Sequence, residues 1–260
     1  MAWDPDRYGV FRRERMQPAR DLLARIELNG AGTIYDLGCG PGEVTRLLAA
    51  RWPQAALIGI DNSPEMLARA ASKLSPIVWI EQSIADFAPA VPADLIFSNA
   101  ALNWLGSHET LLPGFVGHLA PGGVLALQMP RNHDTPSQRA MSDAAWEGSW
   151  WDKLAPLCGG APVAGPAFYY RALRPHVTEL DIWETDYIHV LEGDNPVVEW
   201  MSGTALRPFL AALDEDERGS FLADYSARVA EAYPSQPDGR TLFSMRRLFI
   251  LARAHESLQP

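Results

Sequence analysis

Cysteine and positive charge are both scarce in this chain of 260 residues, and each shortage excludes a class of protein. Only Cys39 and Cys158 occur, with no CxxC pair and no histidine at a metal-ligand spacing. A disulfide framework and a zinc site are therefore excluded. Lysine and arginine total 22 against 32 acidic residues, a formal net charge of -10. Because this field repels nucleic acid and anionic lipid, we expect a small-molecule partner, and neither nucleic acid nor a membrane.

Long apolar runs are also missing. No stretch reaches the roughly 20 residues that a membrane-spanning helix needs, and residues 1–8 lack the apolar segment of a signal peptide. We therefore expect a cytoplasmic protein. The remaining composition, 47% hydrophobic and 21% charged, is typical of a soluble globular fold. The length suffices for one large α/β domain or for a core with a smaller appendage.

Short apolar runs alternate with helical patterns between residues 33 and 129. The predicted strands are Thr33–Leu37, Leu57–Asp61, Ile77–Ile80, Asp94–Ser98 and Val124–Met129. The predicted helices between them are Glu43–Trp52, a helix capped by Ser63 that runs to about Leu74, and one that ends at Pro121-Gly122-Gly123. Repeated βαβ units predict a parallel sheet with helices on both faces, hence an α/β fold.

After Pro130 this alternation stops. Residues 131–175 are rich in Trp, Pro and Gly and are interpreted as an insertion over the sheet. A long strand Glu179–Leu191, helices Asn195–Leu213 and Asp214–Tyr233, and a last strand Phe243–Ala252 are predicted to follow. The expected parts are an N-terminal helical lid (1–30), an α/β core that binds a cofactor (31–130), the insertion (131–177), and remaining strands with a helical cap at about 192–240 (178–260).

A glycine-rich loop follows the first predicted strand. Gly38, Gly40 and Gly42 stand between a strand and a helix, where missing Cβ atoms let the backbone turn sharply and lie against a ligand. A dinucleotide-binding loop has its third glycine one residue later, and here that position is Glu43. A carboxylate there disfavours a pyrophosphate but tolerates the cationic amino-acid end of S-adenosylmethionine.

Three acids follow the first three predicted strands in order. Asp36 is expected beside the ammonium or sulfonium of the donor, and Asp61 is placed to accept two ribose hydroxyls. Asp86 is expected to accept from the adenine amino group, with Ile84 and Phe87 beside the ring and Met66 over its other face. An acid after a strand is otherwise often an N-cap of the next helix, so the combination across three βα units carries the prediction.

Several segments resemble class I methyltransferases and, among these, the trans-aconitate 2-methyltransferase family. They are Trp3-Asp4-Pro5 with Tyr8 and Arg15, Asp94–Ala100 with Leu102 and Trp104, Gln128-Met129-Pro130, Asp181-Ile182-Trp183, Thr204–Phe209 and Arg247–Ile250. The resemblance covers nearly the whole chain. It implies a Rossmann-like sheet with a mainly helical cap, and transfer of a methyl group from S-adenosylmethionine to one carboxylate of trans-aconitate.

The expected cofactor is S-adenosylmethionine without a metal. The residues expected to bind it are Tyr8, Arg15, Asp36, Gly38, Cys39, Gly40, Asp61, Asn62, Met66, Ser83, Ile84, Asp86, Phe87, Asn99, Ala100 and Trp104. Tyr8 and Arg15 are expected to close over it, and Trp104 with Asn99 to form a floor between donor and acceptor. A buried aromatic with a packing role is the alternative for Trp104.

The acceptor needs no general base, since a carboxyl group with a pKa near 4 is ionised at pH 7. We expect catalysis to come from orientation of the acceptor and from arginines that hold its other carboxylates. Trp104 and Arg207 are therefore the candidates for positioning. The residues expected to bind the acceptor are Arg131, His133, Tyr169, Tyr170, Arg207 and Arg246. The alternative is a surface cation for Arg207, a loop surface residue for His133, and a packing role for Tyr169 and Tyr170. Trp146, Trp150 and Trp151 are expected in a core.

Two other functions stay open at this point. A different small carboxylic acid, or a malonyl group on a carrier protein, fits the same donor loop. The absence of an obligatory base also allows a module that binds the cofactor without catalysis.

Overall fold

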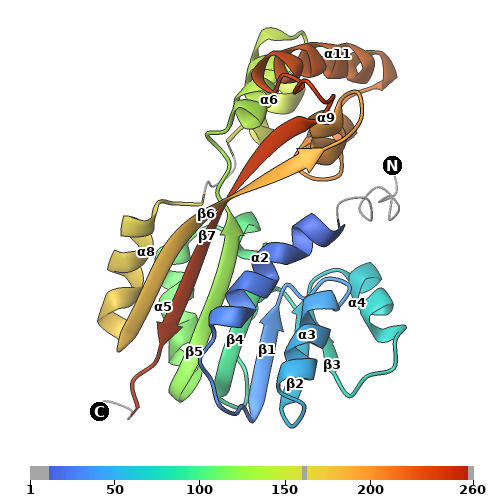
Figure 1. The fold of residues 1–260 in the computed structure, drawn as a ribbon. Helices are drawn as coiled ribbons and strands as arrows, with labels where there is room; N and C mark the ends of the chain where they lie inside the picture. The colour runs from blue at the N-terminus through green and yellow to red at the C-terminus, as the bar shows by residue number, and fades with distance from the viewer. Residues whose placement is uncertain (1–11, 160–162, 257–260) are drawn as a thin grey trace. The chain divides into compact units, whose positions relative to one another are not determined.

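The computed structural model describes residues 12–159 and 163–256 (Figure 1). Its contacts divide the chain into two compact units. Of the described residues, we call 16–130, 163–185 and 247–256 the core unit, and 12–15, 131–159 and 186–246 the cap unit. The segment 131–177, interpreted from sequence as one insertion, is thus shared between the two units.

One seven-stranded sheet organises the described chain. Its order is β3-β2-β1-β4-β5-β7-β6, with bounds β1 Thr33–Leu37, β2 Ala56–Asp61, β3 Val78–Glu81, β4 Ala93–Asn99, β5 Leu119–Pro130, β6 Glu179–Leu191 and β7 Thr241–Arg253. Strands β1 to β5 pair in parallel, whereas β7 pairs antiparallel with β5. The α/β class is confirmed, and the sheet is mixed rather than purely parallel.

The central strands are apolar because both of their faces are covered. Ile34, Leu37, Leu95, Ile96 and Phe97 are all 0% exposed, as expected of parallel strands between two helical layers. The chain order reverses between β1 and β4, and at such a point the connections leave in opposite directions and open a crevice at the carboxyl ends of the strands.

Helices cover both faces of the sheet in the core unit. In Figure 1, α2 crosses one face while α5 and α8 lie behind the other. The bounds are α2 Arg12–Arg25, α3 Glu43–Arg51, α4 Pro64–Ala71, α5 His108–Gly117 and α8 Pro166–Leu173, with 3-10 turns η1 Ile84–Asp86, η2 Leu102–Trp104 and η4 Arg174–His176. Helix α4 begins as predicted, since Ser63 Oγ accepts from the Met66 amide at 3.3 Å.

The predicted end of α5 is wrong. The helix ends at Gly117, and Pro121-Gly122-Gly123 lies inside β5, where the ladder with β4 shifts register. Gly122 has a φ of 72°, and a Cβ on Gly123 would lie 2.7 Å from the Ala93 carbonyl oxygen. The glycine pair therefore serves a strand irregularity and a close backbone approach, not a helix stop.

The cap unit is mainly helical. It contains α6 Pro136–Glu147, α7 Trp151–Leu154, the 3-10 turn η3 Ala155–Leu157, α9 Pro196–Ser202, α10 Leu206–Ala212 and α11 Glu215–Ala232. The single helix predicted for residues 195–213 is divided, because α9 ends before Gly203. Helix α11 starts with a capping box between Asp214 and Glu217. Among the three clustered tryptophans, Trp150 is buried as expected, whereas Trp146 is 67% exposed.

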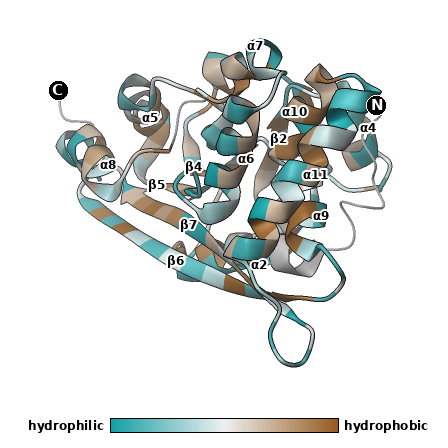
Figure 2. Ribbon diagram, turned by 90° about the horizontal axis from the view of Figure 1, so that it is seen from above, coloured by the Kyte–Doolittle hydropathy of each residue, from teal (hydrophilic) through white to brown (hydrophobic). Residues whose placement is uncertain are grey.

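Strands β6 and β7 form a ribbon whose register follows from its side-chain pairs. Contacts join Glu179 to Arg253, Trp183 to Phe249, Asp186 to Arg246, and Glu192 to Arg240. Each step forward along β6 is matched by an equal step backward along β7, as in an antiparallel ladder. Hydrophobic and hydrophilic residues alternate along β6 (Figure 2), which is typical of a strand with one solvated face.

Candidate functional site

The glycine loop between β1 and α3 is tied to the neighbouring strand. The amides of Gly38 and Cys39 both donate to the Ile60 carbonyl oxygen of β2, at 2.8 and 2.9 Å. Gly38, Gly40 and Gly42 have φ angles of 76°, 51° and 75°. These left-handed conformations explain why glycine occupies all three positions.

The three glycines meet different surroundings. A Cβ on Gly38 would lie 2.2 Å from the Ala101 Cβ, and one on Gly42 would lie 2.4 Å from the Trp79 ring. A Cβ on Gly40 would meet nothing within 4 Å. Gly38 and Gly42 are therefore required by packing inside the protein, and the open side of Gly40 is where a ligand can approach the backbone.

Trp79 of β3 was not identified from sequence. Its ring also fills the place of a Cβ on Gly59, at 2.5 Å, and the Arg46 guanidinium carbon lies 5.7 Å from the ring centroid. The spacing of Gly42 and Gly59 gives no sign that one aromatic ring rests on both. The third glycine of the loop thus serves this ring.

Asp61 joins the loop to the start of α4. Its Oδ2 accepts from the Gly40 amide at 2.8 Å, and its Oδ1 accepts from the Ser63 amide at 2.9 Å. The carboxylate is therefore fixed at the carboxyl end of β2, and each oxygen keeps a lone pair for another donor. This arrangement is compatible with the predicted contact to two ribose hydroxyls.

Asp36 is a buried acid at the end of β1. It is 2% exposed and accepts from Thr45 Oγ1 at 2.6 Å. Burial raises its pKa to about 7, against the lowering effect of the Thr45 hydrogen bond, and the charge of Asp61 raises it further. Burial also raises the pKa of the Cys39 thiol. Such a carboxyl group gains its charge when a cation binds beside it.

The cofactor-binding residues predicted in the segment after β3 lie in different surroundings. Ser83 Oγ caps η1 by accepting from the Ala85 amide, and Ile84 Cδ1 would lie 3.3 Å from a Cβ on Gly38. Asp86 is exposed. Phe87 is 6% exposed, and its ring meets those of Tyr35 and Phe115 edge-on. The structure thus brings Ile84 to the loop, whereas the 3-10 turn directs Phe87 into the core.

The end of β4 lies against the same loop. Ala100 has a φ of 54°, unusual for a residue with a Cβ, and its amide donates to the Gln128 carbonyl oxygen at 2.9 Å. Ala101 covers Gly38, as described above. Trp104 is 71% exposed, and its role as a floor between donor and acceptor stays a prediction. Asn62 is exposed and Met66 is half-buried, both near the start of α4.

The predicted acceptor residues are distributed over both units. Tyr169 is 0% exposed in the core unit, and its hydroxyl lies 2.9 Å from His108 Nδ1 and 3.2 Å from the Ala164 amide. It is a packing residue here, whereas Tyr170 is 53% exposed. The cap unit contains Arg131, His133, Arg207 and Arg246. His133 and Arg207 are exposed, and Arg246 Nε donates to Asp186 Oδ1 at 3.1 Å.

Tyr8 lies outside the described residues, and so does the Arg15 side chain. Within residues 12–159 and 163–256, no group of three or more His, Cys, Asp or Glu side chains is placed to hold a metal ion. No described helix is both long and apolar enough to cross a membrane.

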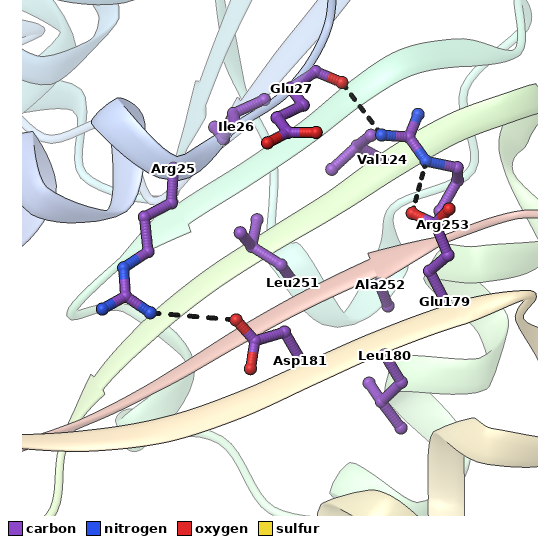
Figure 3. A pocket seen from close by; sticks show the side chains of 10 residues that line it. All are labelled: Arg25, Ile26, Glu27, Val124, Glu179, Leu180, Asp181, Leu251, Ala252 and Arg253. Atoms are coloured by element: carbon purple, nitrogen blue, oxygen red, sulfur yellow. Dashed lines mark hydrogen bonds and ion pairs between the residues drawn. The ribbon is translucent and has the colours of Figure 1, made fainter.

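A surface hollow of about 280 Å³ lies at the other end of the sheet (Figure 3). Both of its arginines already pair with acids: Arg25 lies 3.8 Å from Asp181, and Arg253 lies 2.9 Å from Glu179. Arg253 also donates to the Glu27 carbonyl oxygen. This hollow is separate from the glycine loop, and its ion pairs leave it no clear preference for a charged ligand.

Comparisons with known proteins agree with this geometry. The Methyltransferase domain family matches residues 34–123. The chain is 49% identical to a trans-aconitate 2-methyltransferase of Azoarcus over 96% of this chain and 98% of that one. It is 46% identical to one of Rhodopseudomonas palustris over 96% and 98%. A solved structure from Bacillus halodurans, described as a putative methyltransferase, has a TM-score of 0.58 at 13% identity and covers 91% of this chain and 98% of that one.

Proposed function

We propose that this chain, which belongs to the trans-aconitate 2-methyltransferase family, transfers a methyl group from S-adenosylmethionine to one carboxylate of trans-aconitate. The products are a monomethyl ester and S-adenosylhomocysteine. The observation that carries the proposal is identity of 49% over 98% of a relative's length, so the similarity includes the cap as well as the glycine loop.

The donor site is assigned to the carboxyl ends of β1 and β2. Gly40 offers an open backbone surface, Asp61 offers free lone pairs for ribose hydroxyls, and Asp36 gains its charge beside an ammonium group. Further contacts are proposed for Gly38, Cys39, Asn62, Met66, Ser83, Ile84, Asp86, Asn99 and Ala100. The donor supplies a methyl group already activated by a positively charged sulfur.

The chain needs no base for this reaction. The attacking oxygen belongs to a carboxylate that is ionised at pH 7, so binding and alignment are the main contributions of the protein. We assign the acceptor clamp to Arg207, with Arg131, His133, Tyr170 and Arg246 as further contacts. A cation that pairs with a distal carboxylate holds the acceptor without using the oxygen that reacts.

The test is an assay of methyl transfer from labelled S-adenosylmethionine to trans-aconitate, with a mass spectrum of the ester. Asp61→Ala is expected to lose turnover at limiting donor, because the ribose contacts and the loop bond from Gly40 are removed together. Turnover that depends on a malonyl-carrier protein would favour the alternative substrate. Donor binding without turnover on any di- or tricarboxylic acid would contradict the proposal and favour a non-catalytic module.

The same proposal includes a small polycarboxylate as the partner and a cytoplasmic location. The net charge of -10 disfavours nucleic acid and anionic lipid as partners. The same charge opposes a polycarboxylate at long range, so this partner requires local cations.

A further inference from the structure

Gln128 of β5 carries a buried amide that the fold does not satisfy. The residue is 1% exposed, and neither Oε1 nor Nε2 has a hydrogen-bond partner in the described chain. Native proteins pair nearly all such atoms, because an unpaired buried donor or acceptor is unfavourable. An amide that is closed to water and unpaired therefore points to a partner that arrives with a ligand.

The position of Gln128 is fixed by its strand neighbours. Gln128 stands opposite Asn99 in the β4–β5 ladder, and its carbonyl oxygen accepts from the Ala100 amide. Asn99 Oδ1 is also buried without a partner. Asp36 stands opposite Phe97, two residues before Asn99. Because side chains alternate along a strand, Asp36, Asn99 and Gln128 share one face at the carboxyl ends of β1, β4 and β5.

This face is the acceptor side of the proposed donor site. The glycine loop and Asp61 lie at the ends of β1 and β2, and strands are spaced by about 4.8 Å. Gln128 is therefore displaced by two strands from β1, in the direction away from Asp61. A nucleophile that attacks the methyl carbon in line must approach from beyond the donor, and β4 and β5 supply the sheet edge on that side.

We propose that Gln128 is a specificity-determining residue whose Nε2 donates to a carboxylate of the acceptor. This inference rests on the proposed function. A neutral amide suits the position because a guanidinium on this face would pair with the buried Asp36 carboxyl group instead of the substrate. In a site closed to water, one such hydrogen bond also discriminates strongly against acids that lack a carboxylate at that place.

The test replaces the amide by an unbranched apolar side chain of similar length. Gln128→Met is expected to raise the acceptor KM by about 10-fold or more, since a hydrogen bond to a charged group is lost. Donor affinity measured by calorimetry should stay within about two-fold. The melting temperature of the unliganded variant should rise, because an unpaired buried amide is removed. Gln54→Met, at an exposed glutamine, is the matched control and should change none of these values.

Gln128→Glu sharpens the result. The new carboxylate repels the acceptor, so its KM should rise further than in Gln128→Met. A lower melting temperature of Gln128→Met would overturn the proposal, because it would reveal a structural partner of the amide. A changed donor affinity with an unchanged acceptor KM would also overturn it. If the wild-type chain methylates a different acid, the same variants are measured with that acid, so failure of the proposed function stays distinguishable.

Discussion

At the scale of single residues, Asp36 is a buried acid whose charge depends on its surroundings. The folded chain holds its carboxyl proton up to a pH of about 7, whereas an unfolded aspartate releases it near pH 4. Between about pH 4 and pH 7 the folded chain keeps a proton on Asp36 that the unfolded chain has released. The free energy of unfolding therefore decreases as the pH rises through this range. The group therefore weakens the unliganded fold most above pH 7, where a bound ammonium group would compensate its charge.

Asp36→Asn is expected to melt at a higher temperature than the wild type at pH 8, with a difference in unfolding free energy on the order of 2–4 kcal/mol. The difference should shrink as the pH is lowered to 5. Donor affinity of the wild type should fall below pH 7, while that of the variant should be weaker and independent of pH. Thermal melts and calorimetry over this range provide the test, and a variant less stable at pH 8 would refute the burial argument.

Substitutions at Gly40 and Gly42 should distinguish a glycine needed for ligand binding from one needed for packing. Gly42→Ala forces a Cβ into the Trp79 ring at a positive φ, and we expect a loss of about 2–4 kcal/mol in stability. Gly40→Ala meets no atom within 4 Å, so its stability loss should be only about 1 kcal/mol, from the positive φ. Donor affinity should nevertheless fall by at least about 10-fold in Gly40→Ala. Equal melting temperatures for the two variants would contradict the assignment.

At the scale of elements, one buried hydrogen-bonded chain holds the turn after β4. His108 Nε2 lies 2.9 Å from the Leu102 carbonyl oxygen of η2, so this nitrogen donates and Nδ1 accepts from the Tyr169 hydroxyl. The Ala164 amide donates to that hydroxyl. Helices α5 and α8 are thereby joined to the turn whose Ala101 covers Gly38.

Tyr169→Phe removes the hydroxyl and leaves His108 Nδ1 and the Ala164 amide unpaired. The expected cost is about 1–3 kcal/mol of unfolding free energy, measured by urea denaturation. Tyr170→Phe, on the exposed side of the same helix, is the matched control and should change stability by less than about 0.5 kcal/mol. A similar loss in both variants would show that the hydroxyl of Tyr169 is not the cause.

The elements that could be predicted from sequence are those specified by local patterns. Strand β1 was predicted to the residue, and so was β6, because apolar patterning and flanking breakers coincide there. The Ser63 cap was correct for the same reason. The interior positions of Phe87 and Tyr169 depend on contacts with distant helices, which no local pattern contains. Gln128 escaped attention as a site residue because only the three-dimensional structure shows that its amide lacks a partner.

At the scale of the whole molecule, donor and acceptor functions are assigned to different parts of the chain. The predicted donor contacts with described side chains lie in the core unit, while Arg207 lies in the cap unit. The overall charge of -10 opposes a polycarboxylate at long range, so local cations must hold it. Variants should therefore divide into two kinetic classes.

Arg207→Ala is expected to raise the acceptor KM by about 10-fold, with donor affinity unchanged, because the guanidinium is assigned to the acid alone. Arg139→Ala removes an exposed cation of α6 in the same unit and serves as the control. Steady-state kinetics with varied acceptor, together with donor calorimetry, measure the two effects. Unchanged acceptor kinetics in Arg207→Ala would assign the clamp to another cation.

The place of β7 in the sheet also sets an order of events during synthesis. Strand β7 begins at Thr241 but pairs with β5, which ends at Pro130. While the ribosome synthesises residues 131–240, β5 is an edge strand. Its amides and carbonyl oxygens that later pair with β7 have no strand partner during this time. Open apolar edges favour association between nascent chains. Slow translation of this stretch should thus expose the protein to aggregation, and a nascent chain halted before residue 241 should depend on chaperones far more than the finished one.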